Sequence, residues 1–407
     1  MATQRPFVVM EKEASRLIRR LEGFLGGATV DKALAKYEKS LKTSGPILER
    51  YYTPYVHPWW DSLKKYRKLV KSGKSVWKYM RDPFERSLIK SAYEIGILQA
   101  DMPESVRDKF RKDLVDDKNA WAYLFEIQIA SHYYQYGYDI SWYEDDGQPR
   151  PEFKVTADGF EFDVECKRIS VDASRKLRRV DFYRLAEMLL PELSARLLCG
   201  TIDIELAGRL PPTRTQLENI SNQIQLAIPD SGIDSVIHFP FGKVTLSISR
   251  NVGQEANWND LYSSMMARKH HSAHGVVFST SGAITAKDPI QMLITPKKSE
   301  KVLQGIESKI KSAAKQLDGN RPGLICCYLE GLEELSGLEK ESNLNKMSSH
   351  VLDRDGLSHV IGVSYCVESR PLHSGNVETF SMQGLIFRNP NCKFNVPPEV
   401  RFLTDES

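Results

Sequence analysis

A strict alternation of apolar and charged residues runs through residues 160–167 of this 407-residue chain. Its apolar positions are Phe160, Phe162, Val164 and Cys166, and its charged positions are Glu161, Asp163, Glu165 and Lys167. A period of two places successive side chains on opposite faces of a strand. The pattern therefore predicts a strand with one apolar face and one face that carries acids and a lysine.

Residues 151–156 alternate in the same way, and Ala157, Asp158 and Gly159 separate the two runs. Aspartate followed by glycine is typical of the tight turn of a β-hairpin. We therefore expect the two runs to pair as a hairpin. This pairing would bring Glu152 of the first run toward Glu165 of the second.

The other hydrophobic patterns predict an α/β chain with helices before and after this hairpin. Residues 8–115 are predicted to be helical, with glycines and prolines between the helices. A helix over 120–136, which carries Glu126, and a strand over 138–143 lead into the hairpin. Further strands are expected over 236–239, 244–249, 276–279, 360–367 and 380–387.

Two segments compete for the strand that lies beside 160–167. One is a helix and strand within 177–206, and the other is a helix and strand within 301–329. Hydrophobic periodicity fits both segments equally well. If the second one completes the sheet, residues 170–300 are an insertion.

Carboxylates and a lysine at this spacing suit the hydrolysis of a phosphodiester. The reaction needs negative charge stabilised on the phosphate and hydroxide generated near neutral pH, and a hard divalent cation held by carboxylates supplies both. Mg²⁺ is the expected ion, with Mn²⁺ as the alternative. Lys167 projects to the same face as Glu165, about 7 Å along the strand, where it can orient a water or neutralise the phosphate.

The order Pro151-Glu152, then Glu165-Cys166-Lys167, resembles the signature of the PD-(D/E)XK (restriction-endonuclease-like) nuclease superfamily. The resemblance covers roughly residues 117–206. It implies an α/β fold with a restriction-endonuclease-like three-layer core and a central mixed sheet, in a domain of residues 116–407 with insertions. Residues 1–115 form the helical region before it. Glutamate stands at position 152, where the family usually has aspartate.

The resemblance also implies a role for each residue of the site. Glu152, Glu165 and the Cys166 carbonyl are expected to hold the metal ion. Lys167 is expected to orient the attacking water, and Glu126 to assist from its helix. The implied reaction is cleavage of DNA that leaves a 5′-phosphate and a 3′-hydroxyl.

A second interpretation leaves the same fold without catalysis. Acids that stack along one face of a strand repel one another unless a cation or basic side chains offset them. Lys154, Lys167 and Arg168 can do so without a metal. The chain would then be a nucleic-acid-binding or scaffold protein, and metal-dependent cleavage separates the two hypotheses.

The net charge is only +3, so a nucleic-acid partner has to be argued from where the charges lie. One segment rich in Lys and Arg spans 61–94 and is interleaved with Trp and Tyr. A second follows the triplet, and we expect it to contact the DNA backbone. Its residues are Arg168, Arg175, Lys176, Arg178 and Arg179. For both runs the alternative is a solvated helix face, with the aromatic residues of the first run turned to the core.

Composition and the missing motifs narrow the class of protein. The chain has neither an apolar run of membrane-spanning length nor an apolar signal core, so we expect a cytoplasmic protein without membrane contact. Its six cysteines are expected to be reduced core thiols. No P-loop is present, so nucleotide-driven movement would need a protein partner. A protein partner or homo-oligomer, and a place in a microbial restriction or antiviral system, are expected by analogy.

Overall fold

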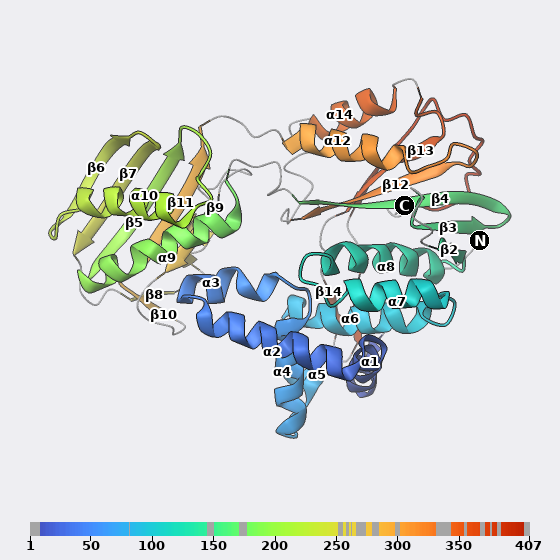
Figure 1. Cartoon of the computed structure of the whole chain (residues 1–407), viewed down its shortest axis with the longest axis horizontal. Coiled ribbons are helices and arrows are strands. Elements are labelled where there is room, and N and C mark those ends of the chain that lie inside the picture. The colour runs from blue at the N-terminus through green and yellow to red at the C-terminus, as the bar shows by residue number, and fades with distance from the viewer. Residues whose placement is uncertain are drawn as a thin grey trace. The chain divides into compact units, whose positions relative to one another are not determined.

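The computed structural model describes residues 9–80, 82–144, 150–170, 177–250, 255–257, 260–261, 263–265, 274–278, 285–297, 302–330, 343–353, 356–366, 371–374, 377–380 and 384–402. The fold is mixed α/β and contains two mixed sheets (Figure 1). The chain divides into two compact units. Unit 1 comprises Met1–Glu38, Val56–Val171 and Leu303–Ser407, and unit 2 comprises Lys39–Tyr55 and Asp172–Val302.

The first part of the chain is helical, as the sequence predicts. Its helices are α1 (Glu11–Leu25), α2 (Gly27–Thr43), α3 (Pro46–Tyr51), the 3-10 turn η1 (Thr53–Tyr55), α4 (Trp60–Lys71), α5 (Val76–Tyr79), α6 (Pro83–Leu98) and α7 (Glu104–Asp113). The two-residue strand β1 (Val9–Met10) was not predicted. Its partner strand, β15 (Val377–Phe380), lies near the other end of the sequence. β15 also pairs with β14 (Pro371–Ser374).

The aromatic residues of the 61–94 run and its immediate neighbours point mainly into the core of these helices. Trp59, Trp60, Tyr66 and Trp77 are buried, whereas Tyr79 is exposed. Several basic residues of the run pair with acids or aromatic rings of the same helical region. These contacts include Lys65 with Glu85, Arg67 with Glu22 and Asp31, Arg86 over the Trp77 ring, and Lys90 with Glu94. The alternative reading, aromatic residues turned to the core, is therefore correct for most of this run.

Unit 1 contains a six-stranded sheet in the order β16-β13-β12-β4-β3-β2. Its strands are β2 (Asp139–Trp142), β3 (Phe153–Ala157), β4 (Phe160–Ser170), β12 (Gly323–Glu330), β13 (Val360–Cys366) and β16 (Gly384–Arg388). The predicted hairpin is confirmed, because β3 and β4 pair antiparallel. Asp158 and Gly159 between them both have positive φ, 50° and 86°, the backbone that a two-residue hairpin turn requires.

Helices cover both faces of this sheet. In Figure 1, α8 (Ala120–Gln135) lies on one face, and α12 (Val302–Ala314) and α14 (Asn343–Leu352) lie on the other. The apolar side of β4 meets α8, where Phe162 packs edge-on against Tyr133 with ring centres 5.5 Å apart. The side chains of Asp163 and Glu165 on the opposite side of β4 are also buried. The prediction of one apolar and one acidic face is thus correct, and the middle of the acidic face lies inside the protein, whereas Glu161 is partly exposed.

The structure decides which segment lies beside β4. β12 runs parallel to β4, in register from Gly323 opposite Asp163 to Glu330 opposite Ser170. α12 leads into β12, so the second of the two candidate segments completes the sheet. The first candidate lies in unit 2, and the chain between β4 and α12 is an insertion into the core of unit 1.

Unit 2 contains a five-stranded sheet in the order β6-β7-β5-β11-β9. Its strands are β5 (Leu198–Leu206), β6 (Gly232–Phe239), β7 (Gly242–Arg250), β9 (His274–Phe278) and β11 (Ile290–Pro296), with α9 (Arg179–Ala195), α10 (Arg214–Ala227) and the short pair β8 (Glu255–Asn257) and β10 (Thr285–Lys287). Leucines and isoleucines of α9 and α10 pack on apolar residues of this sheet. β5 and β11 are parallel and the other pairs are antiparallel.

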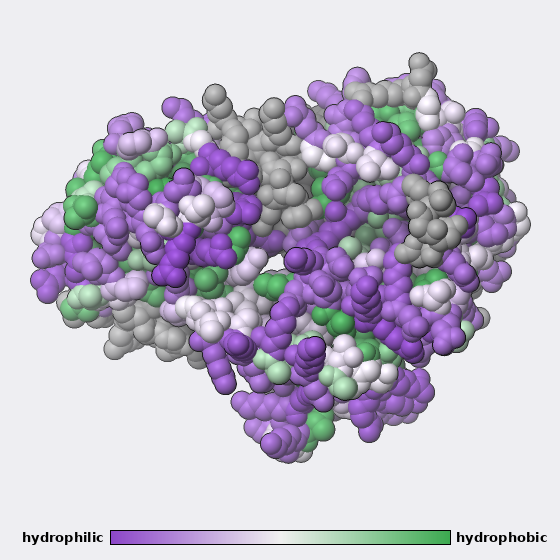
Figure 2. All heavy atoms as spheres, viewed as in Figure 1, coloured by the Kyte–Doolittle hydropathy of each residue, from purple (hydrophilic) through white to green (hydrophobic). Residues whose placement is uncertain are grey.

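The surface, the helices and the cysteines give three further facts. The face drawn in Figure 2 is mostly hydrophilic, with only scattered apolar areas. No helix in the described part of the chain is both long enough and apolar enough to cross a membrane. All six cysteines are free thiols, and five of them are buried, as expected for reduced core residues.

Candidate active site

Glu152 lies at the start of the hairpin whose second strand carries Glu165. The Glu152 amide, one residue before β3, donates a hydrogen bond of 3.0 Å to the Val164 carbonyl. The register of the hairpin ends with Phe153 opposite Val164. Glu152 lies close enough to Glu165 for its charge to raise the pKa of Glu165, so the two predicted acids interact.

Glu165 is the most deeply buried of the acids, with no exposed surface. Its carboxylate forms an ion pair with the ammonium group of Lys167, which is 19% exposed. Apart from this ammonium group, no donor in the described part of the chain reaches either carboxylate oxygen. A buried carboxylate with so few donors is costly unless a cation approaches it.

The third predicted acid, Glu126, is buried on α8. Burial raises its pKa well above the ordinary value, and the charge of Glu152, followed by that of Glu165, raises it further. The three carboxylates therefore interact through a medium of low dielectric constant. The charges of the three acids predicted from the sequence thus act on one another.

The protonation of the central pair follows from the same surroundings. Burial, and then the charge of Glu152, raises the pKa of Glu165 to about 8. Burial opposes the charge on Lys167, but the charge of Glu165 and its hydrogen bond raise the pKa of the lysine above its ordinary value. Lys167 is therefore a cation at neutral pH, and Glu165 can carry a proton there.

The chemistry of these donors fits a hard divalent cation. Carboxylate oxygens are the ligands that Mg²⁺ prefers in proteins, and among the described residues only Lys167 pairs with the Glu165 oxygens. The geometry is less complete, because the described part of the chain contains no group of three or more His, Cys, Asp or Glu side chains placed to hold a metal ion. Lys167 already forms an ion pair with Glu165, so a metal ion would compete with this lysine for the carboxylate.

Cys166 can offer a metal ion only its main-chain oxygen. Its thiol is buried, and burial raises its pKa well above the ordinary value. A thiol that stays protonated is not a ligand for a hard cation. The residue lies in β4 between Glu165 and Lys167, in register with Cys326 of β12.

Asp163, the acid two residues before Glu165, has a different environment. Tyr143 donates a hydrogen bond of 2.7 Å to its carboxylate, and the Nε of Arg321 lies 3.3 Å from the same oxygen. Arg321 also donates to the Tyr143 hydroxyl at 2.7 Å. These contacts join the residue after β2, β4 and the turn before β12, so Asp163 has a structural role.

The basic residues near the acids are also paired. Lys154 contacts Glu161 across the hairpin at 2.6 Å, and Arg168 contacts Glu330 of β12 at 2.8 Å. Together with Lys167, these are the side chains that the second interpretation requires to offset the acids. Pairing of this kind compensates the acidic face without a metal ion.

The predicted nucleic-acid run is divided between the two units. Arg168 belongs to β4 of unit 1, and Arg175 and Lys176 lie outside the described residues. Arg178 precedes α9 of unit 2 and forms an ion pair of 2.6 Å with the buried carboxylate of Asp181. Arg179 is the first residue of α9. Only Arg168 of the described members shares a unit with the acids.

Sequence reasoning missed two residues beside the acids. Tyr123 lies three residues before Glu126 on α8, and the ammonium group of Lys109 on α7 lies 5.6 Å from the centre of its ring. The charge of Lys109 lowers the pKa of both Glu126 and Glu165, against the larger effect of burial. The spacing from Glu126 could have identified Tyr123, but the position of Lys109 depends on how α7 packs on α8.

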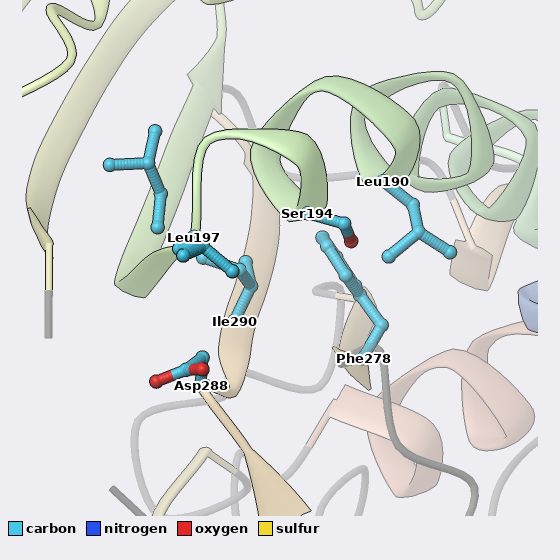
Figure 3. A pocket seen from close by; sticks show the side chains of 7 residues that line it. Leu190, Ser194, Leu197, Phe278, Asp288 and Ile290 are labelled. Carbon is cyan, nitrogen blue, oxygen red and sulfur yellow. The ribbon is translucent and has the colours of Figure 1, made fainter. Parts of the chain in front are cut away.

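Unit 2 contains a small cavity whose lining includes a single acid and no basic residue. It is lined by Leu190, Ser194, Leu197, Leu198, Phe278, Asp288 and Ile290 (Figure 3). Its volume of about 10 Å³ is that needed by a single water molecule. The cavity is too small for a substrate.

No protein family, no curated protein and no solved structure matches this chain.

Proposed function

We propose that this chain is a metal-dependent nuclease of the PD-(D/E)XK type, which hydrolyses DNA phosphodiester bonds with Mg²⁺ or Mn²⁺. The observation that carries the proposal is the ion pair of the buried Glu165 with the partly exposed Lys167 on β4, with Glu152 near it at the start of the hairpin. A fully buried carboxylate with one lysine as its partner is costly as a structural element alone. The pair suits a site that stabilises charge on a phosphate.

The order of elements in unit 1 supports a restriction-endonuclease-like core. A helix, three antiparallel strands, a second helix and a strand parallel to the third follow one another as α8, β2, β3, β4, α12 and β12. This is the order that the resemblance implies. The acids lie on its first helix and on its central hairpin.

In this proposal Glu152, Glu165 and the Cys166 carbonyl hold the ion, which supplies charge stabilisation on the phosphate and a water of lowered pKa. Lys167 keeps its proton, so it acts as a hydrogen-bond donor that orients the water and not as a base. Glu126 has a raised pKa, so its anion is a stronger base than free glutamate and can take up the proton of the attacking water.

The proposed substrate is DNA, cut to leave a 5′-phosphate and a 3′-hydroxyl. Arg168, Arg175, Lys176, Arg178 and Arg179 are the proposed contacts to its backbone. For Arg168 and Arg178, DNA would have to share guanidinium groups that already pair with Glu330 and Asp181. By analogy, we place the protein in the cytoplasm as the effector of a microbial restriction or antiviral system, acting with a protein partner or as a homo-oligomer.

The ion pairs around the acids favour one alternative function. Lys167 already compensates Glu165, and Lys154 and Arg168 are paired with acids of the same sheet. A protein that binds nucleic acid or partners on this fold without cleaving would need no metal ion. Dependence of strand cleavage on the ion therefore distinguishes the two functions.

The test is cleavage of plasmid and single-stranded DNA with Mg²⁺, Mn²⁺ or EDTA. Wild type, Lys167→Ala and Lys154→Ala are compared, because Lys154 forms the same kind of ion pair in the same sheet, away from Glu165. We expect metal-dependent cleavage by wild type and Lys154→Ala, and its loss in Lys167→Ala. Absence of cleavage by wild type with either ion, or equal rates for wild type and Lys167→Ala, would refute the proposal.

A further inference from the structure

α7 brings a lysine to the side of α8 that carries Glu126. The ammonium group of Lys109 lies 5.6 Å from the centre of the Tyr123 ring. Tyr123 and Glu126 are three residues apart on α8, so they are neighbours on one face of that helix. Lys109 is half-buried, so part of its side chain remains open to solvent.

The residue next to Lys109 fixes α7 in this position. Phe110 is buried, and its ring packs edge-on against Tyr123 and Trp142, with ring centres 5.5 Å and 5.3 Å apart. Trp142 belongs to β2, the strand that pairs with β3 of the hairpin. The backbone at Lys109 is therefore held against both the helix and the sheet that carry the acids.

Lys109 is a second cation in the surroundings of the acids. Its charge acts on Glu126 and Glu165, as does that of Lys167. Glu152 is the other acid that acts on both. The acid cluster thus has one lysine from its own strand and one from a helix outside the predicted motif.

We propose that Lys109 positions the phosphodiester backbone of DNA at the acid site. The inference rests on the proposed function and adds a substrate-binding residue to it. A phosphate that approaches three carboxylates is repelled by each of them, so cations on its path lower the cost of entry. Lys109 and Lys167 are both partly exposed, and Lys109 reaches the acids from a separate helix.

A residue in this role has opposite effects on the two ligands of the site. Replacement of Lys109 by a neutral residue removes an attraction for phosphate, so DNA binds more weakly. The same replacement removes a repulsion for Mg²⁺, so the metal ion binds as tightly as before or more tightly. A lysine that only supports the fold would weaken both ligands together.

The test uses the full chain with Lys109→Met, Lys109→Arg and, as a control, Lys112→Met. Lys112 is an exposed lysine of the same helix. Binding of a duplex oligonucleotide is measured in EDTA at several salt concentrations, and Mg²⁺ binding by calorimetry without DNA. For Lys109→Met we expect weaker DNA binding, a salt slope smaller by about 1, and no loss of Mg²⁺ affinity. Lys109→Arg keeps the charge and should restore DNA binding, and Lys112→Met should resemble wild type.

Two results would overturn the inference. One is a Lys109→Met protein whose DNA affinity and salt slope equal those of wild type. The other is a Lys109→Arg protein that loses as much DNA affinity as Lys109→Met, which would show that the shape of the side chain matters and its charge does not. Because binding is measured in EDTA, the role of Lys109 is decided even if wild type proves unable to cleave. That failure would refute only the proposed nuclease activity.

Discussion

Glu165 and Lys167 form an ion pair within a single strand, with the carboxylate fully buried and the ammonium group partly exposed. Side chains two residues apart on a strand point to the same side, so the pair needs no contribution from another element. A metal ion at Glu165 would compete with this ammonium group for the carboxylate. At neutral pH an ion would therefore have to displace the ammonium group or the proton from Glu165.

Replacement of either member of this pair should abolish cleavage without unfolding the protein. We expect Glu165→Ala and Lys167→Ala to lower turnover by a factor of at least ~100. The remaining carboxylate in Lys167→Ala can take up a proton, because its pKa is already about 8. Cleavage rates and circular dichroism melting curves are the measurements. Unchanged turnover in either folded variant would contradict the site assignment.

The two acids nearest Glu165 should respond differently to loss of charge. Glu152→Gln should weaken Mg²⁺ binding, because one carboxylate fewer attracts the ion. Asp163→Asn should leave Mg²⁺ binding intact and lower the free energy of unfolding by about 1–3 kcal/mol, since its partners are Tyr143 and Arg321. Calorimetry with Mg²⁺ and urea unfolding on both variants decide this. The reverse pattern would make Asp163 the metal ligand.

Mg²⁺ affinity should rise with pH through about 8, the pKa of Glu165, because the ion binds the ionised carboxylate. Stability without metal should change in the opposite direction. The folded state holds the proton of Glu165 more tightly than the unfolded chain, whose value is near 4.5. Its contribution is complete below that value and is lost as pH rises through about 8.

Calorimetry and urea unfolding between pH 6 and about 9 measure both effects. Glu165→Gln serves as the control, because an amide does not titrate in this range. Wild type and Glu165→Gln with the same pH dependence in both measurements would show that another group is responsible.

A chain that begins near residue 116 should be insoluble. The helices before that point bury Trp59 and Trp60, and α6 packs directly against α8. Their removal would uncover the face of α8 that α6 covers, and a large exposed apolar patch promotes aggregation. Expression followed by size-exclusion chromatography tests this. A monomeric, folded fragment would show instead that these helices are a separate module.

Local sequence patterns were sufficient for the elements that form the site. The period-two runs and the Asp158-Gly159 turn specify the hairpin, and a long apolar run that ends before Gly137 indicates α8. The crossover was not predictable, because both candidate segments have the same periodicity and differ only in their pairing with β4. Strand pairing depends on contacts between segments that are distant in sequence, and the periodicity of one segment does not predict these contacts.

The surroundings of each acid also could not be predicted from the sequence. Asp163 and Glu165 have identical places in the alternation, but Asp163 receives Arg321 from the turn before β12, whereas Glu165 receives Lys167 from its own strand. Lys109 was missed for a related reason, since nothing in α7 itself points to the acids. Contacts between elements distant in sequence decide which charged side chain is structural.

The insertion of unit 2 between β4 and α12 has a consequence for how the protein folds. β4 and β12 lie side by side, but the chain from Ser170 to Val302 has to be synthesised and its ends closed before they pair. Closing a flexible loop of this length costs roughly 4 kcal/mol of chain entropy, less if the inserted sheet has already formed and holds its own ends. Formation of the hairpin can therefore precede completion of the central sheet, and the edge of β4 that β12 later covers would remain open in a newly synthesised chain. Mutations that slow the folding of unit 2 should prolong that interval and increase aggregation during synthesis, without altering any residue of the acid cluster.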